Sequence, residues 1–310
     1  MSKNLRVKAS KFIDETSTLS FKFNGKIYYG FKGDTLASAL IANDVHLVGR
    51  SFKYHRPRGI MTAGSEEPNA IVQVNANTAY TEPNVRATEI EIYEGLEASS
   101  QNCWPSVQFD IGGINNILSP VLPAGFYYKT FMWPAVFWEK VYEPIIRKAA
   151  GLGSLSLLED PDEYDKGFRH TDLLIIGAGP SGLMAALTAG RAGNDVILAD
   201  EDFVFGGRLN SETFAINDDA ADVWVQATIA DLSAMPNVRL MTRTTVIGAF
   251  DHGTYGAVER VSDHVIMPAA GKPRQVLWRI YAAKTILAAG ATERPIAFEN
   301  NDRPGIMLAS

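Results

Sequence analysis

A glycine-rich turn between two apolar runs constrains the fold of this chain more than any other feature. The run Leu173–Ile176 is followed at once by Gly177-Ala178-Gly179-Pro180-Ser181-Gly182 and then by an apolar segment with helical spacing. A second apolar run, Val196–Ala199, closes on Asp200. Strand, G-x-G-x-x-G, helix, strand and terminal acid in this order are typical of a dinucleotide-binding βαβ unit.

Each glycine of the turn has its own expected role. Gly177 permits the tight turn, Gly179 lets a pyrophosphate approach the backbone, and Gly182 lets the helix pack closely on the strand. The N–H groups and the dipole at the helix N-terminus favour phosphate. Asp200, or Glu201 beside it, is expected to bind a ribose diol. An acid at this place, without an adjacent arginine, favours NAD or FAD over a 2′-phosphorylated dinucleotide.

Three further stretches carry candidate contacts to the dinucleotide. Gly207 and Arg208 follow the second strand, where they either approach the phosphates or ribose or form a plain turn. Val246 lies where folds of this class bring main chain to the adenine. Ala289 and Gly290 end a short apolar strand, and their small size would let backbone approach the ligand.

Composition and charge exclude several classes of function. Lysine and arginine number 29 against 35 acidic residues, and this net charge of −6 argues against nucleic acid as the main partner. The single cysteine, Cys103, excludes an internal disulfide. The five histidines show no metal-ligand spacing, and no nucleophile and base stand out, so we assign neither a metal site nor a catalytic residue. Without a signal-like N-terminus or a long apolar segment, a cytoplasmic protein is expected.

The first 100 residues predict a small β-grasp-like domain. Asn24-Gly25, between segments of alternating hydrophobicity, predicts a β-hairpin. Thr35 is a candidate N-cap for a helix that begins at Leu36. Strands are expected over 70–74 and 87–93. The basic loop 50–59 is either a solvated face or an anchor for an anionic cofactor or an acidic partner.

Residues 101–165 are predicted to be an aromatic-rich connecting segment and linker, with helical spacing over 133–150. Its aromatic side chains either pack across two domains or form a surface for a partner subunit. They are Trp104, Phe126, Tyr127, Tyr128, Phe131, Trp133, Phe137, Trp138 and Tyr142. Residues 166–310 are predicted to form the dinucleotide domain, and the apolar final stretch 304–310 indicates that this domain is incomplete and truncated.

Several long strings of residues resemble the α subunits of the heterotetrameric sarcosine oxidases, over essentially the whole chain. They lie at 51–59, 66–70, 123–134, 290–295 and 301–305. The resemblance implies an α+β and α/β protein, an N-terminal fragment of the subunit. An N-terminal β-grasp domain of the [2Fe–2S] ferredoxin type, with its cluster lost, precedes a Rossmann-like FAD/NAD(P)-binding domain.

The resemblance also implies an oxidoreductase subunit of sarcosine catabolism. The reaction is oxidative demethylation of sarcosine to glycine, with the methyl carbon passed to tetrahydrofolate or released as formaldehyde, and with production of hydrogen peroxide. NAD is expected in this chain, with FAD as the alternative. FAD and covalent FMN are expected in or at the β subunit, and tetrahydrofolate at the missing C-terminal region. The expected partners are the β, γ and δ subunits.

A related group of opine, hydroxyproline and other amine dehydrogenases resembles the same N-terminal domain but carries a [2Fe–2S] cluster. Its cysteines follow Pro-Arg-Gly with C-x₄-C-x₂-C spacing, and these positions are Thr62, Glu67 and Ala70 here. Because none of them is a thiolate and Cys103 stands alone, we expect no cluster. Two alternatives stay open: a flavin dehydrogenase with FAD in this chain, and a structural scaffold subunit.

Overall fold

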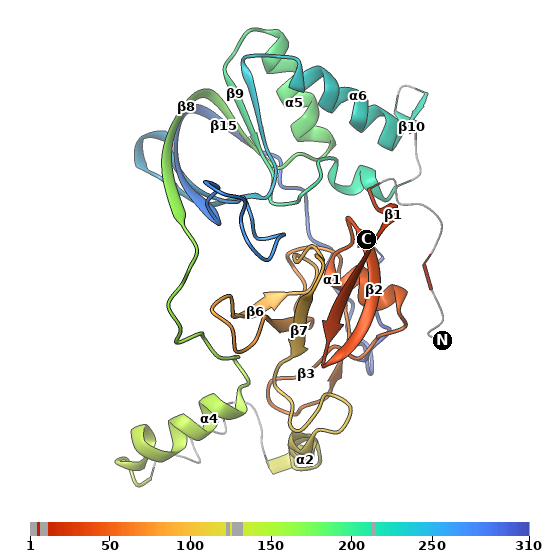
Figure 1. Cartoon of the computed structure of the whole chain (residues 1–310), viewed down its shortest axis with the longest axis vertical. Coiled ribbons are helices and arrows are strands. Elements are labelled where there is room, and N and C mark those ends of the chain that lie inside the picture. The colour runs from red at the N-terminus through yellow and green to blue at the C-terminus, as the bar shows by residue number, and fades with distance from the viewer. Residues whose placement is uncertain are drawn as a thin grey trace. The chain divides into compact units, whose positions relative to one another are not determined.

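A computed structural model describes residues 5–6, 12–121, 125, 133–212, 215–216 and 218–309 of the chain. The chain divides into two compact units, shown in Figure 1. The N-terminal unit comprises the residues up to Asp160 together with Arg294–Ala309, and the dinucleotide unit comprises Pro161–Glu293. The predicted limits had placed 294–309 in the dinucleotide domain, whereas this segment packs within the N-terminal unit.

The N-terminal unit is built on a five-stranded sheet with the order β2-β1-β7-β5-β6. Strands β1 and β7 are parallel, and the other neighbours are antiparallel. The strands are β1 (Asp14–Phe23), β2 (Lys26–Lys32), β5 (Ile71–Val74), β6 (Glu82–Arg86) and β7 (Leu96–Ser100), and a separate pair is formed by β3 (Gly49–Arg50) and β4 (Pro57–Arg58). The predicted hairpin at Asn24-Gly25 is confirmed, since β1 and β2 pair across it.

Helix α1 (Leu36–Ala42) covers one face of this sheet. The Thr35 hydroxyl accepts a hydrogen bond from the Ser38 N–H at 3.1 Å, which confirms the predicted N-cap. Leu36 and Leu40 are fully buried and pack with Phe21 and the apolar residues of β5 and β7. An apolar helical stripe against alternating strand residues therefore forms the core of the unit.

The predicted strand over 87–93 is wrong. Residues 87–89 form a turn, and the stretch carries only an isolated bridge between Glu91 and Thr35. The carbonyl oxygens of Ala87 and Ile90 accept hydrogen bonds from the N–H groups of Ala37 and Leu36, at 2.9 and 2.8 Å. The segment therefore satisfies the free N-terminal N–H groups of α1 instead of joining a ladder.

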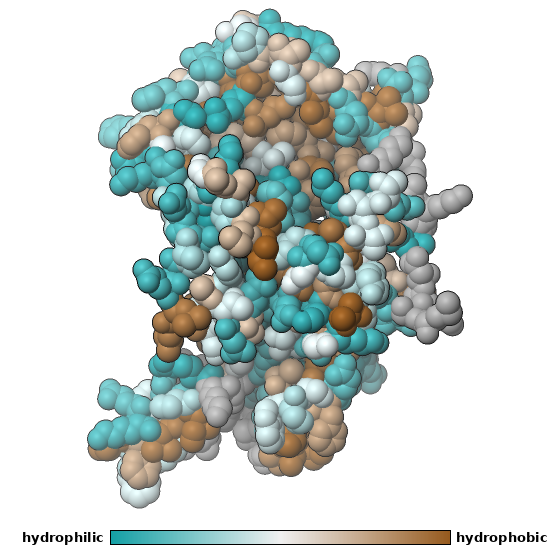
Figure 2. Space-filling model, in the orientation of Figure 1, coloured by the Kyte–Doolittle hydropathy of each residue, from teal (hydrophilic) through white to brown (hydrophobic). Residues whose placement is uncertain are grey.

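The connecting segment is only partly helical and leaves many apolar side chains exposed. It contains η1 (Ile111–Gly113), α2 (Ile114–Ile117), η2 (Ser119–Val121), the π-helical turn η3 (Trp138–Tyr142) and α4 (Glu143–Ala149). Trp133 is 83% exposed and Leu157 is 99% exposed. Apolar surface over α2 and α4 is visible in Figure 2. Phe126, Tyr127, Tyr128 and Phe131 lie outside the described residues.

The dinucleotide unit contains a six-stranded sheet with the order β12-β9-β8-β15-β14-β13. The first four strands are parallel, and the last two pair antiparallel. They are β8 (Tyr164–Ile176), β9 (Val196–Ala199), β12 (Val238–Met241), β13 (Thr244–Phe250), β14 (Thr254–Arg260) and β15 (Gln275–Leu287). The short apolar strand expected to end at Ala289 and Gly290 is the last part of β15, which is longer, ends at Leu287 and pairs with both β14 and β8.

Helices α5 (Pro180–Arg191) and α6 (Ala221–Ser233) cover one face of this sheet (Figure 1). Their apolar residues Leu183, Ala186, Val225 and Leu232 are buried in one core with Ile175 and Leu198. The remaining elements are η4 (Gly207–Asn210), β10 (Ala215–Ile216), β11 (Asp219–Ala220) and η5 (Asp251–Gly253). Among the described residues, we find no helix with the length and apolar character needed to span a membrane.

Candidate functional site

The glycine turn follows β8, and two of its glycines are required by the fold itself. Gly177 has a φ of +99°, and a Cβ there would lie 2.5 Å from the Ala288 carbonyl oxygen. A Cβ on Gly182 would lie 1.9 Å from the Gly177 carbonyl oxygen. Both contacts are too short for any side chain, so these positions fix the tight turn and the close approach of α5 to β8.

Gly179 differs from its two neighbours because open space surrounds it. No atom lies within 4 Å of the place where its Cβ would stand, and its φ of −70° suits any residue. It is the N-cap of α5, and Pro180 begins the 12-residue helix. The first N–H groups of an α-helix have no partner within the helix. The absence of a side chain at Gly179 therefore leaves this helix end open to a ligand.

The second glycine loop lies directly against the first. The Gly206 N–H donates to the Ala178 carbonyl oxygen at 2.9 Å. A Cβ on Gly207 would lie 3.2 Å from the Gly179 Cα. The loop that carries Gly207 and the exposed Arg208 thus borders the open space at Gly179, as expected if it contributes to the site.

Asp200 closes β9 and binds the glycine turn internally. One carboxylate oxygen accepts a hydrogen bond from the Ala178 N–H at 2.5 Å, and the other accepts from the Asp202 N–H at 2.9 Å. Burial raises the pKa of Asp200, against the opposite effect of these two hydrogen bonds. Each oxygen keeps a further lone pair for a ribose hydroxyl. This bracing role was not predicted, although an acid placed directly after the strand beside the turn was its signal.

The remaining residues predicted to contact the dinucleotide lie on β13 and just after the end of β15. The Thr244 N–H donates to the Asp200 carbonyl oxygen at 2.7 Å, which brings the start of β13, and with it Val246, beside the end of β9. A Cβ on Gly177 would lie 3.0 Å from the Ala289 Cα, so β15 ends against the glycine turn. Gly290 follows with a φ of +70° and open space around it. The predicted residues therefore gather at the carboxyl ends of the parallel strands, where open α/β sheets bind ligands.

The basic loop of the N-terminal unit is neither a solvated face nor a free anchor. Arg56 and Arg58 both pair with Asp302 of the segment 294–309. Arg50 donates to the Val107 carbonyl oxygen at 2.8 Å, and His55 Nδ1 lies 2.6 Å from an Asp110 carboxylate oxygen. These charges hold together distant parts of the same unit.

A buried carboxylate organises the loop that contains Thr62, Glu67 and Ala70. Glu67 is 1% exposed, and its Oε2 accepts hydrogen bonds from the N–H groups of Met61 and Thr62 at 2.8 and 2.7 Å. Its Oε1 accepts from the N–H groups of Asn69 and Ala70 at 2.8 and 3.0 Å. Four backbone donors on one carboxylate compensate for removing its charge from water.

The two units define a class of protein: a ferredoxin-like β-grasp domain followed by a domain of the FAD-dependent oxidoreductase type. The family described as 2Fe-2S iron-sulfur cluster binding domain matches residues 16–103. The family described as FAD dependent oxidoreductase matches residues 172–258. The predicted fold class is thereby confirmed.

The chain is similar to the α subunits of sarcosine oxidase, which confirms the resemblance found in the sequence. It is 59% identical to sarcosine oxidase subunit alpha of Rhizobium meliloti (strain 1021), over 96% of this chain and 30% of that protein. It is 37% identical to the subunit alpha of Corynebacterium sp. (strain P-1), over 96% of this chain and 26% of that protein. The chain thus spans less than a third of the length of these relatives.

A solved structure shares the fold over most of the chain. L-proline dehydrogenase from P. horikoshii aligns with a TM-score of 0.58 and 20% identity, and covers 94% of this chain and 44% of that one. At this identity the likeness concerns the fold alone.

Our prediction that the chain holds no [2Fe–2S] cluster is contradicted by the match of residues 16–103 to a cluster-binding family. The residues at the expected ligand positions are Thr62, Glu67 and Ala70, and the chain has one cysteine. Burial, and then the charge of Asp110, raise the pKa of the Cys103 thiol. Such a cluster takes four thiolates, and this donor set does not fit it. We therefore assign no step to a cluster.

Proposed function

We propose that the dinucleotide unit binds an adenine dinucleotide at the glycine turn between β8 and α5. The observation that carries this proposal is the contrast among the three glycines. Neighbouring backbone occupies the space where a Cβ of residue 177 or 182 would stand. Gly179, in contrast, opens onto free space at the N-terminus of a 12-residue helix. A pyrophosphate needs this combination of a rigid turn and an unobstructed helix end.

Different residues around the turn would contact different parts of the dinucleotide. The N–H groups at the start of α5, with Ala178, Pro180 and Ser181 forming the turn, would hold the pyrophosphate. Asp200 or Glu201 would accept hydrogen bonds from the ribose. The backbone at Val246 would border the adenine. Gly207, Arg208, Ala289 and Gly290 would line the phosphates and the part of the ligand beyond them.

We further propose that the chain is the cofactor-binding part of the α subunit of a multi-subunit sarcosine oxidase. The 59% identity over 96% of the chain supports this proposal. The reaction of the whole enzyme would convert sarcosine, oxygen and water to glycine, formaldehyde and hydrogen peroxide, or pass the methyl carbon to tetrahydrofolate. The resemblance implies that amine oxidation occurs in the β subunit, so this chain would bind a cofactor without performing that step. The location proposed for the enzyme is the cytoplasm.

The exposed apolar side chains of the connecting segment would contact the partner subunits of this assembly. Trp104, Trp133 and Leu157 are each more than two-thirds exposed. Large aromatic side chains are enriched in the cores of protein interfaces. This exposure favours the partner-surface interpretation over packing between two domains.

Whether this chain binds NAD or FAD distinguishes a cofactor-binding subunit from a flavin dehydrogenase. The match to an FAD-dependent family favours FAD, and the resemblance to the sarcosine oxidases implies NAD. The visible absorption spectrum of the purified protein, separated from flavin-bearing partner subunits, distinguishes these cofactors because only a flavin absorbs visible light. A yellow chain indicates a flavin dehydrogenase, and a colourless chain that releases NAD on denaturation indicates a cofactor-binding subunit. A chain that binds neither contradicts the proposal.

A further inference from the structure

Two arginines converge on one tryptophan ring on the face of the dinucleotide-unit sheet that α5 and α6 do not cover. Arg169 lies on β8, Arg239 on β12 and Trp278 on β15. The guanidinium carbon of Arg169 lies 4.4 Å from the centroid of the Trp278 ring, and that of Arg239 lies 5.7 Å from it. Two positively charged groups therefore lie close to the same ring.

Neither charge is paired with a carboxylate of a described residue, although the Glu259 charge partly offsets the effect of Arg239 on Arg169. Neither guanidinium forms an ion pair or a hydrogen bond with any of the residues that the structure describes, and Arg169 Nε is buried without a partner. Glu259 accepts a hydrogen bond from Trp278 Nε1 at 2.6 Å. Burial, and then the charge of Arg239, lower the pKa of Arg169, as expected for a guanidinium held beside a like charge.

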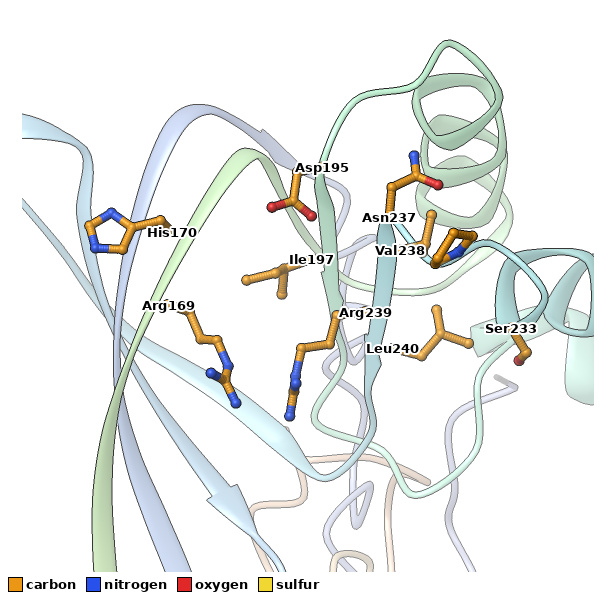
Figure 3. Close-up of a pocket in the computed structure, with 10 residues that line it drawn as sticks. Arg169, His170, Asp195, Ile197, Ser233, Asn237, Val238, Arg239 and Leu240 are labelled. Atoms are coloured by element: carbon orange, nitrogen blue, oxygen red, sulfur yellow. The ribbon is translucent and has the colours of Figure 1, made fainter.

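An open pocket of about 540 Å³ lies between these side chains and the loop before β12. Figure 3 shows both guanidinium groups directed the same way on either side of Ile197. Asp195 lies at the opposite end of the pocket, and Asn237 and Ser233 add neutral polar groups to its wall. The positive end of the pocket is thus separated from its one acidic side chain.

We propose that Arg169 and Arg239 form a binding site for a phosphate group, distinct from the glycine turn. A guanidinium presents a planar fork of donors that matches the oxygens of phosphate, and two forks bind it more strongly than one. A phosphate dianion would accept hydrogen bonds from the terminal N–H groups of the two guanidiniums and relieve the repulsion between the two arginines. The shared chemistry is a terminal phosphoryl group, which inorganic phosphate or a small phosphate monoester could supply.

The test is a titration of the full-length protein with inorganic phosphate and, separately, with glycerol 3-phosphate. Trp278 fluorescence reports binding, with chloride at equal ionic strength as the reference and Trp278→Phe identifying the signal. We expect a saturable change in the wild type and at least a tenfold weaker affinity in both Arg169→Gln and Arg239→Gln. Saturation by only one of the two probes identifies the source of the phosphoryl group.

Two variants, one test and one control, keep the proposal falsifiable. Arg239 is exposed, so Arg239→Gln leaves the fold intact even if Arg169→Gln does not. Arg191→Gln removes an exposed charge paired with Asp231 and should bind phosphate like the wild type. The proposal is overturned if phosphate acts no differently from chloride, or if Arg239→Gln binds as tightly as the wild type.

Discussion

The Asp200 carboxylate accepts a hydrogen bond from the Ala178 N–H, across the turn that joins β8 to α5. The carboxylate that was expected only to meet a ribose therefore also fixes the backbone that would meet the pyrophosphate. Its second oxygen accepts from the Asp202 N–H and so holds the loop after β9. Binding of a ribose at Asp200 would therefore be coupled to the shape of the glycine turn through this one side chain.

The first prediction concerns Asp200→Asn and Glu201→Gln. An asparagine has one acceptor oxygen and cannot serve both N–H groups, so Asp200→Asn should lower the free energy of unfolding by about 1–3 kcal/mol. Glu201→Gln leaves these bonds in place and should affect only dinucleotide affinity. Urea unfolding and dinucleotide titration of both variants separate the two effects. Equal stability of wild type and Asp200→Asn would show that the bracing contacts contribute nothing.

The second prediction compares two glycines of the same turn. A Cβ at Gly179 would have no protein atom within 4 Å and the φ there is allowed for any residue, so Gly179→Val should fold normally and lose dinucleotide affinity by at least tenfold. Alanine at Gly177 would meet the Ala288 carbonyl oxygen at 2.5 Å with a φ of +99°, so Gly177→Ala should be unstable instead. Circular dichroism and a binding titration test this contrast. Normal dinucleotide binding by Gly179→Val would refute the assigned role of the open helix end.

The third prediction concerns the buried Glu67. Glu67→Ala would leave four backbone N–H groups without an acceptor and should destabilise the N-terminal unit by about 3 kcal/mol or more. Glu67→Gln keeps one acceptor oxygen and should cost less. Denaturant unfolding measures both, and Glu66→Gln, at the exposed neighbouring residue, is the matched control. A loss in Glu66→Gln equal to that in Glu67→Ala would argue against the specific role of Glu67.

The fourth prediction is a pH effect on the segment 294–309. Burial alone would raise the pKa of Asp302, but hydrogen bonding and the charges of Arg58 and Arg56 lower it below its ordinary value of 3.8. A lowered pKa in the folded state contributes stability above the unfolded-state value, and this stability is lost as the pH falls through the folded-state value. The protection factor of the Leu308 amide, whose N–H donates to the Met61 carbonyl oxygen, should therefore fall below about pH 4, relative to the intrinsic exchange rate at each pH.

The variant Asp302→Asn provides the control for this pH effect. It removes the titrating group and should lower the Leu308 protection factor already at neutral pH, with little further change in that factor on acidification. An identical pH profile in the wild type and Asp302→Asn would assign the transition to another carboxylate.

The sequence predicted those parts of the fold whose signals are local. The Asn24-Gly25 hairpin, the Thr35 cap and the glycine turn are each specified by residues within one element, and all are present. The stretch 87–93 alternates like a strand, yet its carbonyl groups bind the start of α1, a partner that no local pattern reveals. Contacts between distant segments, such as that of Arg58 with Asp302, could likewise not be predicted from the sequence.

The candidate site shows the same division. Its glycines and acid were predictable because the turn chemistry is local, and β15 reaches them only through pairing with β8. The charges of loop 50–59 could not be assigned from sequence, since their partners lie more than fifty residues away for Arg50 and His55 and at Asp302 for Arg56 and Arg58.

The most direct test of the account is to denature the native, full-length protein and to identify the nucleotide it releases by chromatography and absorbance. We predict one adenine dinucleotide for each chain, and at least tenfold less from Gly179→Val at the same protein concentration. Release of no adenine dinucleotide from a correctly folded wild type that also fails to bind added NAD or FAD would contradict the account.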